Sequence, residues 1–357
     1  MNRAAMGERA ADEPPSLARR VLPKLLLSLV LGGILAFVVQ RSGVNIIPEA
    51  GSFVHVTWWT VPAYVGVLLV THFFRASRWR YLVEPVKDDI PFWDGVLLNW
   101  IGFFAIFALP LRLGELARPA LTKIRHRVSI SAGLGTVAVE RVIDGLVASV
   151  CVLWALLALP QREHVTDPIA LSLPYYATVA VGVFVAAFAG LLLFLWQRAF
   201  AVKLIHWTFG RLSKRLGELL SQKVADVAEG VRSVSEPRLA GGFLFETILY
   251  WGTNALGMWL LAWGCGIDMT FGHAVAVMGI LAIGILLPAA PGLFGSFQLA
   301  VSTALKLYFA TALVEEQGAV YVFLMFIVQA VVISAAGLIP LYAMNLKFSD
   351  LLRTQVD

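Results

Sequence analysis

The feature that most constrains this chain is a series of long, continuously apolar runs that begins near Leu25 and continues almost to the C-terminus. A bilayer core about 30 Å thick is crossed by about 20 helical residues. Six segments reach that length, namely 23–40, 54–75, 130–159, 174–197, 240–264 and 318–344. The runs do not alternate between apolar and polar residues over about 10 positions, so they favour helices over a transmembrane barrel.

Composition supports the same conclusion. Hydrophobic residues make up 59% of the 357 positions and charged residues only 14%, against about 25% charged in a soluble domain. A soluble fold of this size could not bury so much apolar surface. The sequence therefore predicts an all-α polytopic membrane protein. Its N-terminal segment, 1–22, is polar and lacks the layout of a cleaved signal peptide.

Several other classes of protein are disfavoured. The two cysteines, Cys151 and Cys265, give neither a disulfide framework nor a CxxC metal site. The net charge of +5 could suggest nucleic acid, but basic residues beside membrane helices explain it better. We expect no metal, no cofactor and no nucleic-acid partner.

Two further apolar stretches, 92–109 and 273–312, are interrupted by proline and glycine. The loop after 92–109 is strongly basic, because it carries Arg112, Arg118, Lys123, Arg125 and Arg127. Basic loops stay in the cytoplasm, so the stretch is expected to enter the membrane and return on the same side. The same reasoning makes 273–312 a hairpin that enters from outside.

The predicted organisation is a single transmembrane domain, 23–345, with about six full spans and two oppositely oriented re-entrant hairpins, about 92–118 and 273–312. The termini, including the tail 346–357, are expected in the cytoplasm and the protein in the inner membrane. Re-entrant backbone is tolerated only where protein or a water-filled cavity covers it. The hairpins should therefore meet near the midplane.

The hairpins share a short pattern, in which Leu-Pro is followed by glycine four residues after the proline. Such a match suggests an inverted repeat, as transporters use. We interpret the residues that break the helices as structural hinges, namely Pro110, Gly114, Pro288 and Pro291.

Residues 199–236 carry leucines at helical spacing with lysine and arginine between them. This pattern predicts a cytoplasmic amphipathic segment that lies on the inner leaflet. Binding of a partner through the same segment is the alternative.

Three ionisable residues, Glu140, Arg141 and Asp144, lie inside the 130–159 span. Glu140 is about 15 Å from the start of that helix and therefore near the midplane. Charge at this depth is costly and usually functional, which favours a polar cavity for a charged headgroup. An internal salt bridge that ties the helix to the first hairpin is the alternative. Both hold if Arg141 is paired and Glu140 is free.

Two other groups are candidates for substrate binding. Arg112, Glu115 and Arg118 fall on one helical face, and arginine suits phosphate, although contact with anionic lipid explains them equally well. In the second hairpin the candidates are Gly292, Gly295, Ser296 and Gln298. Unwound backbone there offers hydrogen-bonding groups to an anion, and a sharp turn without a ligand is the alternative.

Arg75, Arg78 and Trp79 close the second span and are interpreted as interfacial anchors. The chain contains no HExxH, GxSxG or P-loop pattern. We therefore assign no catalytic residue and expect a protein that is not an enzyme.

These residues give the chain a resemblance to the lysylphosphatidylglycerol synthase transmembrane-region family, also called flippase-like. The matching motifs are Arg78-Trp79, Leu109-Pro110 with Gly114-Glu115 and Arg118, Glu140-Arg141 with Asp144, and Pro291-Gly292 with Gly295. Gln298 stands where the family pattern has glutamate, so an acidic role is not carried over to it. Family members that synthesise lysyl-lipid add a soluble aminoacyl-transferase domain, so the resemblance implies a stand-alone membrane module without that activity.

The resemblance implies a transporter that moves an amphiphilic lipid, phospho- or polyprenyl-linked, between leaflets. Membrane lipids are then its expected partners, and association into a homo-oligomer or with another membrane protein is left open. The alternatives are a membrane-embedded transferase acting on a lipid-linked substrate, or an accessory subunit.

Overall fold

The computed structural model describes residues 47–109, 114–159, 168–197, 214–286 and 291–346, together with isolated residues between 26 and 37. The described residues form helices and turns and contain no strand. The main helices are α2 (Thr60–Ser77), α4 (Phe92–Ala108), α6 (Ile130–Ala158), α7 (Pro168–Trp196), α10 (Pro237–Gly264), α11 (Phe271–Gly284), α12 (Ser296–Tyr308) and α14 (Ala319–Ala343). The shorter elements are η1 (Ala50–His55), α3 (Trp79–Val83), α5 (Ala117–His126), α9 (Lys214–Val231), η3 (Arg232–Ser235), η4 (Pro291–Leu293), α13 (Thr311–Leu313) and η5 (Val314–Gly318).

The predicted all-α class is confirmed. Three helical stretches are long and apolar enough to cross a membrane, namely Ile130–Ala158, Leu171–Phe194 and Thr311–Ala343. They coincide closely with three of the predicted spans. The span predicted to start at residue 54 instead begins at Thr60, because the 3-10 turn η1 precedes it. The segment 1–22, most of the predicted first span 23–40 and nearly all of the tail 346–357 lie outside the described residues.

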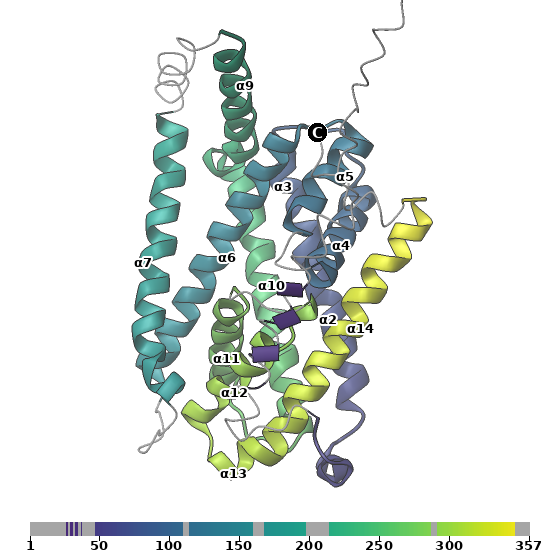
Figure 1. Ribbon diagram of the computed structural model, residues 1–357, viewed down its shortest axis with the longest axis vertical. Helices are drawn as coiled ribbons and strands as arrows, with labels where there is room; N and C mark the ends of the chain where they lie inside the picture. The colour runs from purple at the N-terminus through teal and green to yellow at the C-terminus, as the bar shows by residue number, and fades with distance from the viewer. Residues whose placement is uncertain are drawn as a thin grey trace, which may run out of the picture.

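The two predicted hairpins approach from opposite ends of the bundle (Figure 1). α4 and α5 pack together at the end that carries α3 and α9, whereas α11 and α12 pack together towards the end that carries α13. The hairpins meet inside the bundle, where η4 contacts α4. The return limb of the first hairpin is longer than predicted, since α5 continues to His126 instead of ending at Arg118.

Glycine permits both hairpin turns. A Cβ atom on Gly114 would overlap the backbone of Ala105 and Ile106, so α4 approaches the returning chain at a distance that only glycine allows. Gly292 and Gly295 have φ angles of 78° and 88°, which side chains disfavour. These observations support the predicted turns. Pro110 and Pro288 lie outside the described residues, and the inverted repeat stays a prediction.

The core of the bundle is built by close packing of α2 against α10. Tyr64 on α2 and Met258 on α10 are fully buried, and the Thr71 hydroxyl donates to Thr253 Oγ1 at 3.1 Å. In lipid the hydrophobic effect does not drive helices together, so tight packing and hydrogen bonds of this kind hold them.

α9 packs against α6. It runs along the long axis of the molecule beside α6 instead of lying across the bundle (Figure 1). Its C-terminal turn packs closely, because a Cβ atom on Gly135 would come within 3.1 Å of Gly230 Cα. Backbone contact with α6 therefore fixes the helix against the bundle, and its position at the inner leaflet stays a prediction. Residues 199–213 of the predicted segment lie outside the described residues.

The expectation that α4 and α5 form a re-entrant hairpin makes a labelling prediction. In a chain whose two cysteines are replaced by alanine, Asp88→Cys and Lys123→Cys should react with an impermeant maleimide from the same side of the membrane, because α4 and α5 form a hairpin. Asp268→Cys, between α10 and α11, should react only from the opposite side. Labelling of positions 88 and 123 from opposite sides would mean that α4 crosses the membrane.

Candidate functional site

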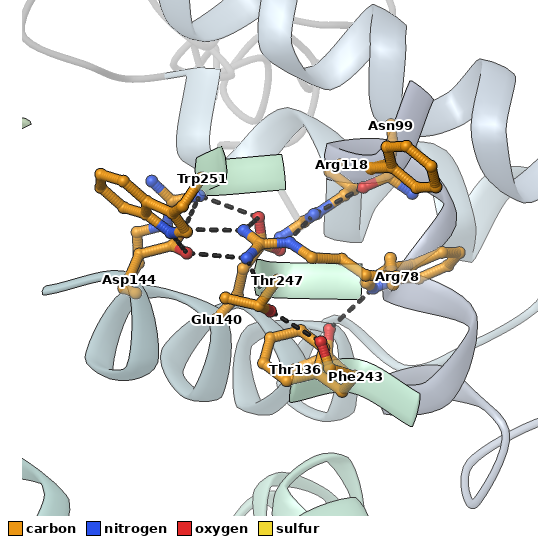
Figure 2. Close-up of polar contacts among 12 residues, drawn as sticks. Arg78, Asn99, Arg118, Thr136, Glu140, Asp144, Phe243, Thr247 and Trp251 are labelled. Atoms are coloured by element: carbon orange, nitrogen blue, oxygen red, sulfur yellow. Dashed lines mark hydrogen bonds and ion pairs between the residues drawn. The ribbon is translucent and has the colours of Figure 1, made fainter. Parts of the chain in front are cut away.

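Glu140 is the centre of a buried charge cluster. Its side chain on α6 is fully buried and is contacted by three arginines (Figure 2). Oε2 lies 2.6 Å from Nη1 of Arg118. Oε1 lies 2.9 Å from Nη2 of Arg141 and 3.3 Å from Nη2 of Arg78. A single carboxylate thus joins three separate segments of the chain.

Asp144 lies one helical turn after Glu140 and faces the same side of α6. Both of its oxygens accept hydrogen bonds from Arg78, each at 2.8 Å, in a two-pronged contact. The indole of Trp251 on α10 donates to Oδ1 at 3.3 Å, and Arg141 Nη2 lies 3.6 Å from Oδ2. Such paired contacts are the strongest arginine–carboxylate geometry.

Arg78 stands at the junction of α2 and α3 and is fully buried. Besides the two carboxylates it donates to Thr247 Oγ1 at 3.1 Å. Trp79 is also buried and donates to Thr136 at 3.1 Å. The prediction that Arg78 and Trp79 are interfacial anchors is therefore wrong. Carboxylates on α6 draw the Arg78 guanidinium inward, because only a paired charge is tolerated there.

Arg118 ties the first hairpin to α6. It is 5% exposed, and besides Glu140 its Nη1 atom donates to Asn99 Oδ1 on α4 at 2.5 Å. The predicted salt bridge between the α6 helix and the hairpin is thus confirmed. The prediction that Glu140 is free while Arg141 is paired is wrong, because Glu140 has three cationic partners.

A cavity of about 440 Å³, called here the outer cavity, lies beside the cluster. Its charged wall contains Arg75, Glu115, Arg141 and Asp144. Its apolar lining includes Phe184 of α7, Ile283 of α11 and Leu286, which follows α11. One space therefore offers both charged and hydrocarbon groups.

A smaller cavity of about 120 Å³, called here the inner cavity, lies beyond Arg75 and Arg141, which line both spaces. Both hairpins contribute to its lining, with Phe107 of α4 and Leu293 of η4. Its neutral polar lining includes Asn254 and Gln329. The inner cavity thus lies where the two hairpins contact each other.

The second hairpin uses its polar groups internally. The Gln298 side chain accepts from the Gly295 backbone N–H at 2.8 Å, and the Ser296 hydroxyl donates to the Leu293 carbonyl at 3.1 Å. Both residues are buried. They hold the start of α12, so the turn is supported, and substrate binding by Gly292, Gly295, Ser296 and Gln298 stays a prediction.

Of the other predicted residues, Arg112 lies outside the described residues. Glu115 and Arg118 do not act together, because Glu115 lines the outer cavity while Arg118 is directed at Glu140. Sequence reasoning missed the cavity position of Arg75. The spacing of Arg75 and Arg78, three residues apart on one helix, was the available signal.

Sequence reasoning also missed Asn99, Tyr250 and Trp251, which carry no charge and resemble ordinary residues of apolar helices. Asn99 contacts Arg118, Tyr250 lies over Arg78 with its ring centroid 4.8 Å from the guanidinium carbon, and Trp251 contacts Asp144. Only the assembled fold brings them to the charges.

The fold and this site define a class, namely polytopic helical membrane proteins in which a buried charge cluster borders a half-apolar cavity. The family model of the lysylphosphatidylglycerol synthase TM region matches residues 23–337. The chain therefore belongs to this family, which indicates a membrane location and a function related to lipids. Neither the curated proteins nor the solved structures compared with the chain include a match.

The charge cluster makes a prediction about stability. Glu140→Ala would leave Arg78, Arg118 and Arg141 buried with too little negative charge, and breaking a buried pair costs about 3–5 kcal/mol. The unfolding free energy of the detergent-solubilised protein should fall by about that amount in denaturant titrations.

The matched control is Glu229→Ala, which removes a carboxylate paired with Arg232 at 3.3 Å on the partly exposed helix α9. An exposed pair of this kind contributes about 0–1 kcal/mol. Equal destabilisation by the two variants would contradict a central role for Glu140.

Proposed function

We propose that the protein moves an amphiphilic lipid between the two leaflets of the cytoplasmic membrane and leaves the lipid chemically unchanged. The observation that carries this proposal is the outer cavity, in which Arg141 and Asp144 face apolar residues of α7 and α11. An amphiphile needs this combination, because its headgroup requires polar partners and its tail requires hydrocarbon.

The position of α7 beside the outer cavity favours access from the lipid phase. α7 is the least covered of the three long apolar helices, since only 6% of its most apolar 18-residue stretch is buried. Its Phe184 lies on the cavity lining. A tail can therefore stay between α7 and α11 in the bilayer while the headgroup occupies the charged side.

The hairpins support a route across the membrane. They come from opposite ends of the bundle (Figure 1), and both contribute to the lining of the inner cavity, through Phe107 and Leu293. Movement of either hairpin would open the cavity to one end only. This is the symmetry that alternating access requires.

The distribution of charge supports an orientation in which the end with α3 is cytoplasmic. Lys87, Lys123, Arg125 and Arg127 lie at that end, whereas Asp268, Glu315 and Glu316 lie at the end with α13. Basic residues are retained on the cytoplasmic side, which in a bacterial cell would be the inner face of the inner membrane.

Filling the cavity provides a direct test. Ala282 on α11 lines both cavities, so Ala282→Trp should block the passage of a headgroup. In proteoliposomes that contain fluorescent phosphatidylglycerol or a fluorescent polyprenyl phosphate, the wild-type protein should speed the exposure of the probe to an impermeant quencher. The variant should reduce that rate at least tenfold.

The matched control is Ala189→Trp, because Ala189 lies on the exposed surface of α7. It should flip the probe at the wild-type rate. Analysis of the extracted lipids separates transport from a transferase, since a transporter returns the probe with its mass unaltered. Exposure rates equal to those of empty liposomes with every probe, or a chemically altered probe, would contradict the proposal.

A further inference from the structure

We propose that the lipid carries an anionic headgroup and that the inner cavity binds its phosphate between Arg75 and Arg141. This inference rests on the proposed function and names its substrate class. The buried carboxylates alone do not decide between an anionic and a cationic headgroup. The inference selects the anionic one.

The first step concerns two buried carboxylates, Glu140 and Asp144, which already have cationic partners. Glu140 is contacted by Arg78, Arg118 and Arg141. Both oxygens of Asp144 accept from Arg78, and one also accepts from the Trp251 indole. A cationic headgroup would have to displace these short internal contacts before it paired with either of these two carboxylates.

The second step concerns Arg75, whose charge is not neutralised in this way. Among the described residues, no carboxylate lies within ion-pairing distance of it. Its guanidinium carbon lies 4.1 Å from the centroid of the Phe103 ring. Nε of Arg75 and Nε of Arg141 are both buried without a hydrogen-bond partner. Buried donors of this kind normally have an acceptor.

The third step is the balance of charge around the two cavities. Four guanidiniums, of Arg75, Arg78, Arg118 and Arg141, stand against the carboxylates of Glu115, Glu140 and Asp144. The inner cavity has a larger excess of positive charge, because the described residues that line it include Arg75 and Arg141 and no acidic residue. In surroundings of low dielectric constant, an excess of positive charge favours an anion.

The fourth step is the fit of the inner cavity. Its volume of about 120 Å³ is larger than the space that a single water molecule needs and is enough for a phosphate group. Oδ1 of Asn254 on its wall is also buried without a partner. It can accept a hydrogen bond from a headgroup hydroxyl, while the two arginines donate to the phosphate oxygens.

Binding of short-chain lipids tests the inference without requiring transport. The protein, in nanodiscs of phosphatidylcholine, is titrated with dihexanoyl phosphatidylglycerol, dihexanoyl phosphatidylcholine and inorganic phosphate, and binding is measured by calorimetry. The anionic lipid should bind at least tenfold more tightly than the other two. Equal affinity for the zwitterionic lipid would overturn the inference, and equal affinity for inorganic phosphate would overturn the assignment to a lipid.

Arg75→Gln identifies the site. The substitution deprives no carboxylate among the described residues of its ion-pair partner, so the variant should fold. Measurement of its thermal unfolding checks that it does. Loss of a hydrogen bond to a charged group weakens binding about 10- to 100-fold, and Arg75→Lys should restore part of the affinity. The matched control is Arg238→Gln, at a side chain that is 79% exposed. Unchanged affinity in a folded Arg75→Gln protein would overturn the proposal.

Transport of probes with different charge separates this inference from the proposed function. Faster flipping of a fluorescent anionic lipid than of a fluorescent cationic lipid supports both. Preference for the cationic probe would overturn the anionic site while leaving transport intact. Binding of phosphatidylglycerol that depends on Arg75, without flipping of any probe, would support the anionic site and overturn the transport function.

Discussion

The arrangement of the whole molecule depends on the contacts of one carboxylate, Glu140, with three arginines. Arg78 comes from the junction of α2 and α3, Arg118 from α5, and Arg141 from α6 itself. A carboxylate in a membrane interior is tolerated only when it is paired. The need to pair it therefore fixes the first hairpin and the end of α2 against α6.

The same pairing shapes the candidate site. Because Arg78 and Arg118 are directed at Glu140, they are held away from the two cavities, whereas Arg75 and Arg141 remain on the cavity walls. The four arginines therefore have different roles. Two mainly hold the helices, Arg75 has no carboxylate partner among the described residues, and Arg141 belongs to both groups.

Much of the architecture could be predicted from the sequence, because hydropathy and the position of basic residues respond directly to the bilayer. The α6, α7 and α14 spans and the opposite approach of the hairpins follow from such local signals. The amphipathic pattern around α9 predicts a helix with two faces, but only the structure shows that this helix packs against α6.

The candidate site was only partly predictable. Glu140, Arg141 and Asp144 were recognised because charge within an apolar run is conspicuous. Arg78 was assigned to the interface, because an arginine at the end of a span usually faces headgroups. Its partner Glu140 lies 62 residues further along the chain, so only the tertiary fold reveals the pairing.

The most direct test of this account is an experimental structure of the protein in nanodiscs that contain phosphatidylglycerol. The account predicts headgroup density within hydrogen-bonding distance of Arg75 and Arg141, with Glu140 still contacting Arg78, Arg118 and Arg141. Density for a headgroup bound to Glu140 in place of its arginines, or an inner cavity without lipid, would contradict it.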